Sequence, residues 1–444
     1  MHSFRYRSGK LHCEDVDLER AANEFDTPLY IYSANTIIDH FTRLNAALAP
    51  IDHLICYAVK ANSNRAILKL LSDAGAGFDI VSAGELFRAI NAGADPQKCT
   101  FAGVGKSPSE IEYALDRRVY SFNVESEAEL DLIDQNAGEK KLRAPVALRV
   151  NPDVDAHTHK YISTGSHENK FGIGLAAAPA IYERAGGMRS VDIVGVQMHI
   201  GSQITEAAPF AAAINRVAPL VRDLKSKYGI KFFSIGGGMG IIYRRALESG
   251  PGRWWHEHGG ESSAFSVQDY VSAIIPLLQD LDVRILVEPG RFLVGNAGAL
   301  LTRVRYIKQS GSKKFVIVDS GMNDLIRPAL YQGYHEIVPV IKPGGTGSVL
   351  SQNSRDDTEV VPPLEKVDIV GPVCESGDFF ALDREMPNLR EGDLLAIMSA
   401  GAYGFTMASN YNSRPLAAEA LVRGDELKLI RKRQTWDDLI AREV

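Results

Sequence analysis

The chain has 444 residues, of which 45% are hydrophobic and 23% charged, and its formal net charge at pH 7 is −6. This composition is typical of a folded globular protein and argues against a fibrous or disordered one. The negative net charge, without a long basic run, argues against nucleic acid or an anionic membrane surface as a partner. The length exceeds one ordinary domain, so we expect two, one of them a barrel of about 250 residues.

The first predicted elements are a hairpin and then a barrel. Residues 4–16 are predicted to form a β-hairpin with its turn at Ser8-Gly9. From about residue 55, short apolar runs alternate with stretches of helical periodicity, the pattern of βα units around a parallel sheet. The predicted strands are 54–60, 77–82, 99–103, 120–124, 145–150, 194–200, 231–237 and 284–290. Eight such strands predict an α/β protein with a (β/α)8 TIM-type barrel, which we place at residues 31–291.

The character of the chain changes after residue 291. Short strands joined by Gly- and Pro-rich turns predict a second, mostly β C-terminal domain over residues 292–444. Residues 1–30 are assigned to the same domain, because the predicted N-terminal hairpin is also β structure and precedes the first helical segment. Two polar, Gly-rich stretches, 243–265 and 343–359, are predicted to be surface insertions.

Cysteine usage and the N-terminus indicate where the protein acts. The four cysteines show no CxxC spacing, which argues against a disulfide framework and against structural zinc. The N-terminus has no apolar signal-peptide core, and no apolar run approaches the roughly 18 to 20 residues of a membrane helix. We therefore expect a cytoplasmic protein.

The ends of the predicted strands carry the residues that could perform chemistry, because active sites of such barrels lie there. Lys60 follows an apolar run that would desolvate its amine and lower its pKa, as Schiff-base chemistry requires. A surface lysine is the plain alternative. Polar residues and glycines end other strands: Asp79, His199, Ser202, Gly237, Gly238, Glu288, Gly290 and Arg291. Each alone fits a turn or a core position, but together they favour a functional site.

These residues suit pyridoxal 5'-phosphate. Backbone N–H groups of the glycine run 236–240, with Ser202 and Gly290-Arg291, can bind a dianionic phosphate. Glu288 can keep the pyridine nitrogen protonated, which makes the ring an electron sink for a carbanion. His199 would lie against the ring.

Several motifs resemble the fold-type III pyridoxal-phosphate decarboxylases of the alanine racemase and ornithine decarboxylase superfamily. They are YAVKAN (57–62), HIGSQ (199–203), GGGMG (236–240) and EPGR (288–291). Further segments resemble the diaminopimelate decarboxylase family: NPDVDAHTHKYISTG with NKFG (151–172), DSGMNDLIRPALY (319–331), GPVCESGDFF (371–380) and GAYGFTMASNYNSRP (401–415).

The resemblance implies decarboxylation of meso-2,6-diaminopimelate at its D-centre, giving L-lysine and CO2, the last step of lysine biosynthesis. It implies a homodimer with shared active sites, completed by the β domain. Lys60 resembles the Schiff-base lysine, Glu288 the partner of the pyridinium, and His199 the ring-stacking group; Asp79 and Tyr403 are further expected cofactor contacts.

The resemblance also implies how the substrate is held. The expected substrate contacts are Arg291, Arg327, Tyr331, Glu375 and Tyr403. Cys374 and Glu375 would reach in from the partner subunit, and the Cys374 thiol could return a proton to the α-carbon. A buried, inert cysteine is the alternative.

Other functions stay open from the residues alone. A related decarboxylase could act on carboxynorspermidine, ornithine or arginine, and Arg327 and Glu375 are the discriminating positions. A racemase or a non-catalytic pyridoxal-phosphate-binding protein would use the same barrel. The histidine pairs His157/His159 and His256/His258 lack the HExxH spacing, so no metal is expected.

Overall fold

The computed structural model describes residues 2–154, 170–249, 266–342 and 363–444. Its contacts divide the chain into two compact units. We call Ile37–Ile241 with His258–Val294 the barrel unit. We call Met1–Thr36, Ile242–Glu257 and Gly295–Val444 the β unit. The β unit therefore takes in more of the chain than the predicted 1–30 and 292–444.

The barrel unit is built on a closed ring of parallel strands, as predicted. The strands are β5 (His53–Ala58), β6 (Gly77–Ile80), β7 (Cys99–Phe101), β8 (Ser121–Val124), β9 (Ala144–Asn151), β11 (Val191–Met198), β12 (Phe232–Ser234) and β13 (Arg284–Val287). Each pairs in parallel with its neighbours, and β13 pairs with β5 to close the ring. A two-residue strand, β10 (Ile173–Gly174), adds to the end of β9. The (β/α)8 barrel is thus confirmed, with strand bounds shifted by a few residues.

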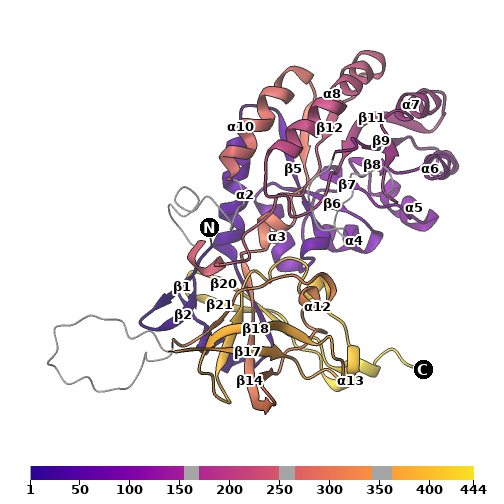
Figure 1. Ribbon diagram of the computed structural model, residues 1–444. Helices are drawn as coiled ribbons and strands as arrows, with labels where there is room; N and C mark the ends of the chain where they lie inside the picture. Colours follow the sequence, from indigo (N-terminus) through magenta and orange to yellow (C-terminus); the bar gives the residue numbers. More distant parts are fainter. Residues whose placement is uncertain (1, 155–169, 250–265, 343–362) are drawn as a thin grey trace. The chain divides into compact units, whose positions relative to one another are not determined.

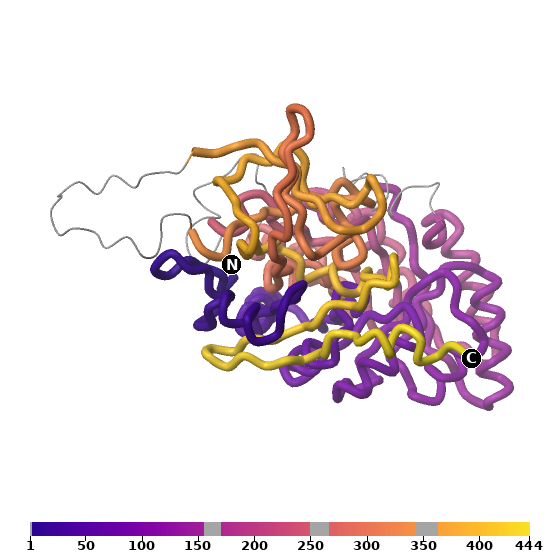
Figure 2. The backbone as a smooth tube through the Cα atoms, turned by 90° about the horizontal axis from the view of Figure 1, so that it is seen from below, coloured from indigo at the N-terminus to yellow at the C-terminus, as the bar shows by residue number. Residues whose placement is uncertain are grey.

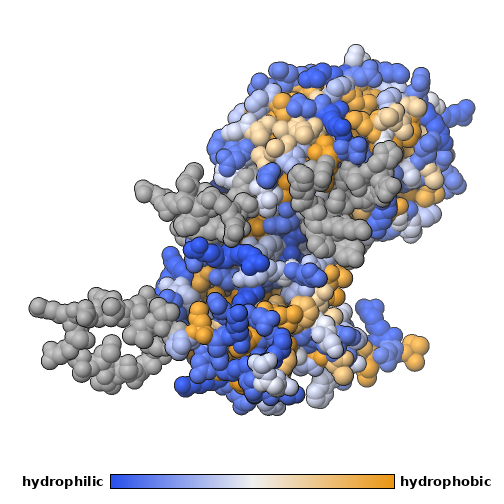
Figure 3. All heavy atoms as spheres, viewed as in Figure 1, coloured by the Kyte–Doolittle hydropathy of each residue, from blue (hydrophilic) through white to orange (hydrophobic). Residues whose placement is uncertain are grey.

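Helices surround the barrel (Figure 1). They are α2 (Ala34–Leu48), α3 (Arg65–Asp73), α4 (Ala83–Asn91), α5 (Pro108–Asp116), α6 (Glu127–Glu139), α7 (Ala178–Gly186), α8 (Ala208–Tyr228) and α10 (Val267–Leu278). Serine N-caps such as Ser82 and Ser107 start helices soon after strands end, because their hydroxyls accept the unpaired N–H groups of the first turn. On the face drawn in Figure 3, hydrophilic side chains dominate the outer rim of the barrel unit, with hydrophobic ones among them.

The β unit is built on a second sheet, which confirms the predicted mostly β domain. Its main path runs β18 (Phe379–Pro387), β17 (Leu364–Val370), β15 (Lys313–Val318), β14 (Gly298–Ser310), β4 (Leu29–Ser33), β20 (Ala418–Arg423) and β21 (Glu426–Arg431). Strand β19 (Leu394–Ile397) pairs with β14 and with β16 (Ile337–Pro339). The pairing of β4 with β20 joins the beginning and the end of the chain in one sheet (Figure 2).

The predicted N-terminal hairpin is confirmed. Strands β1 (Phe4–Arg7) and β2 (Lys10–Cys13) pair antiparallel, and β3 (Val16–Asp17) completes a small sheet before α1 (Leu18–Phe25). Ser8 and Gly9 form the turn with φ of 47° and 78°. Two positive φ values match the twist of a two-residue hairpin turn, which is why a Gly stands there. Leu11 and Cys13 of β2 are buried in the core with Leu29 and Ile31 of β4.

Two further observations concern partners of the fold. In the part of the chain that the structure describes, no helix is long and apolar enough to cross a membrane. No group of His, Cys, Asp or Glu among the same residues is arranged to hold a metal ion. The histidine pairs at 157/159 and 256/258, and most of the two predicted insertions, lie outside the described residues.

Candidate active site

Lys60 lies just after β5, in the short 3-10 helix η1 (Val59–Ala61). Its Nζ is 3.7 Å from Oδ2 of Asp79, which lies near the end of β6. The Lys60 side chain is 42% exposed, so the apolar run before it does not desolvate the amine as the sequence suggested. Burial raises the pKa of Asp79, while the charges of Lys60 and Arg149 oppose the rise. The barrel thus presents a reachable amine beside a buried carboxyl.

Glu288 lies at the end of β13 and is buried. Its Oε1 accepts a hydrogen bond from Ser234 Oγ at 2.6 Å, and its Oε2 accepts one from Gln197 Nε2 at 3.0 Å. Burial and the nearby Asp79 raise the pKa of Glu288 to about 7, against the two hydrogen bonds and Lys60. A cation or an N–H donor next to this carboxyl would stabilise its ionised form.

Glycines form a close-packed turn after β12. Gly236 and Gly238 have φ of 73° and 112°, which favour glycine. A Cβ on Gly237 would lie 2.1 Å from the backbone O of Glu288, and one on Gly238 would lie 2.5 Å from that of Gly201. The backbone therefore approaches neighbouring strand ends more closely than any side chain would allow.

His199 lies against this turn. The backbone N–H of Gly237 donates to His199 Nδ1 at 3.2 Å, so this N–H is engaged within the protein. Burial, together with the charges of Arg149 and Lys60, holds the pKa of His199 well below its usual range. The ring is therefore neutral and carries its proton on Nε2, because Nδ1 accepts a hydrogen bond.

Ser202 and Arg291 are brought together, as predicted. Arg291 begins the short helix α11 (Arg291–Val294), is 6% exposed, and donates from Nη2 to Ser202 Oγ at 3.0 Å. A Cβ on Gly290 would lie 3.0 to 3.1 Å from the Cβ atoms of Ala61 and Ala58. Gly290 therefore packs against the chain on either side of Lys60.

The structure adds polar barrel residues that the sequence analysis missed. Arg149, on β9, donates from Nη1 to both carboxylate oxygens of Glu125 at 3.1 and 3.2 Å. Arg149, Gln197 and Ser234 are polar residues within otherwise apolar strands, and this signal in the sequence could have identified them. Among the described residues, the buried atoms Asp79 Oδ1, Arg149 Nε and Gln197 Oε1 have no hydrogen-bond partner.

Apart from Arg291, which belongs to the barrel unit, the predicted substrate residues lie in the β unit on three linked segments. Arg327 and Tyr331 are the first and last residues of α12 (Arg327–Tyr331). Cys374 is exposed, and its backbone N–H donates to Asn412 Oδ1 at 2.9 Å. The hydroxyl of Tyr411 donates to Glu375 at 3.2 Å.

Asp378 connects two of these segments. It is 4% exposed and accepts the backbone N–H groups of Met322 and Val373, both at 2.6 Å. The loop of Cys374 is therefore fixed to the segment that leads into α12. In the third segment, Tyr403 has a φ of 56°, an uncommon conformation for a residue other than glycine. Such strain persists where the surrounding structure holds it and is often found at functional sites.

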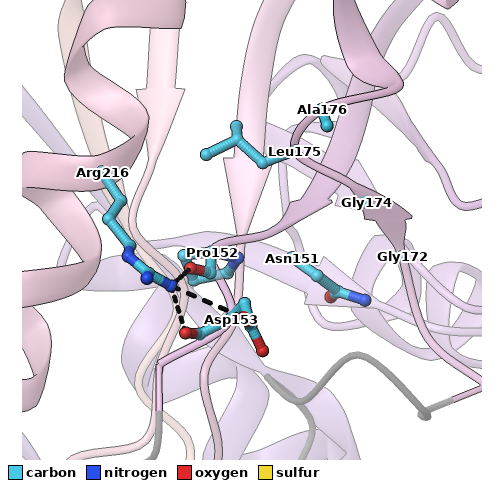
Figure 4. Close-up of a pocket in the computed structure, with 8 residues that line it drawn as sticks. All are labelled: Asn151, Pro152, Asp153, Gly172, Gly174, Leu175, Ala176 and Arg216. Carbon is cyan, nitrogen blue, oxygen red and sulfur yellow. Dashed lines mark hydrogen bonds and ion pairs between the residues drawn. The ribbon is translucent and has the colours of Figure 1, made fainter.

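A cavity of about 480 Å³ lies in the barrel unit beyond the end of β9. It is lined by Asn151, Pro152, Asp153, Gly172, Gly174, Leu175, Ala176 and Arg216. Figure 4 shows Arg216 reaching from α8 toward Pro152 and Asp153; its Nη1 donates to the Pro152 carbonyl at 2.6 Å. The cavity includes none of the predicted site residues.

Known proteins resemble this chain over nearly its whole length. Residues 34–295 match the family model of the pyridoxal-dependent decarboxylases, pyridoxal binding domain. Diaminopimelate decarboxylase of Aquifex aeolicus is 45% identical over 98% of this chain and 96% of its own. That of Pseudomonas aeruginosa is 46% identical over 100% and 99%. The chain belongs to the diaminopimelate decarboxylase family.

Solved structures of this family have the same fold. The diaminopimelate decarboxylase of Helicobacter pylori complexed with L-lysine has a TM-score of 0.84 and 38% identity, covering 96% of this chain and 99% of that one. The M. jannaschii member in complex with L-lysine has a TM-score of 0.87 and 35% identity, covering 100% and 98%. The family resemblance expected from the motifs is thus confirmed.

The barrel residues fit pyridoxal phosphate, the cofactor of this family. The buried atoms without partners, Asp79 Oδ1, Arg149 Nε and Gln197 Oε1, lie on strands whose ends carry the candidate site. The donor set includes a guanidinium and a hydroxyl at Arg291 and Ser202, which suit a phosphate.

One expectation follows for the cofactor-free protein: Glu288→Gln should stabilise it, most of all at alkaline pH. Burial raises the pKa of Glu288 from 4.5 to about 7, so ionising this group costs the folded state free energy. That cost grows as the pH rises from about 4.5 to about 7 and then stays constant. Urea unfolding of both proteins at about pH 5 and about pH 8 tests this. An equal difference in stability at the two pH values would contradict it.

Proposed function

We propose that this protein decarboxylates meso-2,6-diaminopimelate at its D-centre to L-lysine and CO2, the last step of lysine biosynthesis, with pyridoxal phosphate held by the barrel unit. One observation carries the proposal in a member of this family. Lys60, the buried Asp79 and the buried Glu288 lie at the ends of three neighbouring barrel strands, β5, β6 and β13. The four cysteines are free, which supports a reducing compartment such as the cytoplasm as the place of action.

The residues of the barrel unit have separate tasks. Lys60 would hold the cofactor covalently, and Asp79 would orient its amine through the ion pair. Glu288, once ionised, would bind the protonated ring nitrogen, and Ser234 and Gln197 keep its carboxylate in place. Neutral His199 would pack on the ring without adding a charge. The bound cofactor supplies an electron sink for the electron pair that remains when CO2 leaves.

The phosphate would be bound by the Ser202–Arg291 pair and the backbone of Gly238 and Gly290. Arg291 already donates to the hydroxyl of Ser202, so the guanidinium is oriented before a ligand arrives. Gly237 would contribute through its position rather than its N–H, because that N–H donates to His199.

We assign substrate binding and proton return to residues of the β unit, acting across the interface of a homodimer. Arg327, Tyr331, Glu375 and Tyr403 would contact the substrate, with Arg291 from the barrel. Loss of CO2 must be followed by gain of one proton at the same carbon, and the Cys374 thiol would hold that proton. The exposed position of Cys374 and its loop, fixed by Asp378, support such a role in a shared site.

Arg327 would bind the carboxylate of the L-centre, which remains in the product. Arginine suits this task because its planar fork matches a carboxylate and its charge is permanent. The L-lysine complexes of the Helicobacter pylori and M. jannaschii relatives agree with a site that holds this product.

Arg327→Ala is accordingly expected to lower kcat/KM for meso-diaminopimelate by roughly ten- to a hundredfold, since a charged hydrogen bond contributes about 1.5 to 3 kcal/mol. The visible absorbance of the bound cofactor should not change, because Arg327 is assigned to the substrate and not to the cofactor. Steady-state kinetics and a spectrum measure both effects. Unchanged kinetics would remove the assignment of Arg327.

A panel of substrates tests the proposal. Initial rates of CO2 release would be measured with meso-diaminopimelate, ornithine, arginine and carboxynorspermidine, with L-lysine quantified as product. We expect turnover of meso-diaminopimelate to exceed the others by roughly a hundredfold or more, the effect of one or two charged hydrogen bonds. Preference for another amino acid would assign the protein to that reaction, and racemisation without CO2 would overturn decarboxylation.

A further inference from the structure

We propose that His335 is a positioning residue for Arg327: it orients the guanidinium through a neutral acceptor and therefore does not cancel the charge that binds the substrate carboxylate. This inference rests on the proposed function, in which Arg327 makes that contact. All the residues that carry it lie in the β unit.

The chain itself brings residue 335 beside residue 327. Helix α12 ends after five residues, and Gln332 follows with a left-handed φ of 52°. The backbone N–H groups of Gln332 and Gly333 both donate to the carbonyl of Arg327. This tight turn reverses the chain, so His335 returns to the residue with which the helix began.

The hydrogen bonds of His335 determine its tautomer. Its Nδ1 lies 2.8 Å from the carbonyl O of Met398, and its Nε2 lies 2.7 Å from Nη1 of Arg327. A carbonyl can only accept and a guanidinium can only donate. The imidazole therefore carries its proton on Nδ1 and accepts at Nε2, and a second proton would face the Arg327 donor. His335 is neutral in this arrangement.

Packing holds the same guanidinium from another direction. Cζ of Arg327 lies over the ring of Tyr243, 4.6 Å from its centroid. The Tyr243 and His335 rings meet edge to face, with centroids 5.2 Å apart at 81°. His335 is 0% exposed and Arg327 is 7% exposed, so neither group rotates without displacing the other. The backbone carbonyl of His335 is fixed in turn by Arg384 at 3.0 Å.

The chemistry of the partner matters as much as its position. In the barrel unit, Glu125 holds Arg149 through two contacts of 3.1 and 3.2 Å and so neutralises it. The imidazole of His335, 2.7 Å from Nη1 of Arg327, also orients a guanidinium but adds no negative charge. A substrate carboxylate can then bind the Arg327 guanidinium without competing with a second negative charge. Arg327 is therefore suited to select substrates that carry a carboxylate at this position.

Two amide variants separate the two bonds of the imidazole. His335→Asn keeps a donor near the Nδ1 position, for Met398, and removes the acceptor for Arg327. His335→Gln places an amide oxygen near the Nε2 position and keeps that acceptor. We expect His335→Asn to raise KM for meso-diaminopimelate roughly ten- to a hundredfold with kcat within about threefold, and His335→Gln to stay within about threefold in both.

Two competitive inhibitors provide a readout that general damage would not produce. L-lysine carries the L-centre carboxylate, and cadaverine is the same diamine without it. We expect His335→Asn to weaken inhibition by L-lysine while inhibition by cadaverine stays the same. The ratio of the affinity for L-lysine to the affinity for cadaverine should therefore fall toward the ratio measured for Arg327→Ala. In the double variant with Arg327→Ala, the His335→Asn substitution should have no further effect on the ratio, because it acts through the arginine.

The outcomes distinguish this inference from the proposed function. If Arg327→Ala itself leaves the ratio unchanged, the role of Arg327 is wrong and the inference falls with it. If Arg327→Ala lowers the ratio but folded His335→Asn does not, only the inference is overturned. Should His335→Asn fail to fold, His335→Gln decides: a retained ratio supports an acceptor at Nε2, and a ratio lost in a folded protein contradicts it.

Discussion

Lys60→Ala is expected to abolish the visible absorbance of bound pyridoxal phosphate and to lower the rate of lysine formation by a factor on the order of 10³ or more. The amine is the group that would bind the cofactor covalently, and it is reachable, since the side chain is 42% exposed. A methyl group at this position forms no such bond. An absorbance spectrum and an assay of L-lysine from meso-diaminopimelate measure the two losses.

Two control variants separate this chemistry from loss of an ion pair. Lys60→Arg keeps a cation for Asp79, 3.7 Å away, but cannot bind the cofactor covalently, so it should be as inactive as Lys60→Ala. Lys69→Ala removes a lysine from an exposed pair with Asp73 and should leave spectrum and rate unchanged, because exposed ion pairs contribute little. An active Lys60→Arg would show that Lys60 serves as a charge and not as the covalent anchor.

Cys374→Ala is expected to lower kcat by a factor of about 10² to 10⁴, the usual contribution of a group that delivers a proton. The Cys374 side chain is exposed, and its loop is held by Asp378 and Asn412 through backbone N–H groups. The substitution should therefore leave the fold, the cofactor absorbance and KM close to those of the unsubstituted protein.

The other cysteines offer a contrast for this experiment. Cys13, Cys56 and Cys99 are buried, and burial raises the pKa of each thiol. Substituting one of them by serine should affect the free energy of unfolding rather than kcat. Deuterium incorporation into L-lysine in D2O would follow the proton directly. If Cys374→Ala kept full kcat, another group would deliver the proton.

Much of the barrel site was predictable because a parallel barrel gathers the ends of its strands. Asp79, His199 and Glu288 follow separate apolar runs, and counting eight such runs was enough to expect these side chains on one rim. The glycines of 236–240 were predictable for the same reason. The role of these glycines differs in part from the expected phosphate binding, since the backbone N–H of Gly237 donates to His199.

Other features depend on contacts that no local pattern encodes. The partners of Glu288 are Ser234 and Gln197, which stand 54 and 91 residues earlier in the chain. Only the parallel pairing of β11, β12 and β13 brings them together. The pairing of β4 with β20 joins residues almost 400 positions apart. The Lys60 side chain is more exposed than its apolar neighbours suggested, and the residue lies in η1, beyond the end of β5.

The β unit also contains contacts that no local sequence pattern encodes. The motif around Arg327 predicted a substrate arginine by resemblance, but its partner His335 lies outside that motif and was not singled out. Only the reversal of the chain after α12 and the contact with Tyr243 give His335 a role. Asp378 similarly gains its meaning from the two backbone N–H groups that it accepts.

Reductive trapping would identify the lysine that binds the cofactor. The purified protein would be incubated with pyridoxal phosphate, reduced with borohydride and digested, and the peptide that carries the cofactor would be identified by mass spectrometry. We expect one modified lysine, Lys60, with modification prevented in Lys60→Arg. Modification of a different lysine at full occupancy, with Lys60 unmodified, would contradict the assignment of the cofactor to the end of β5.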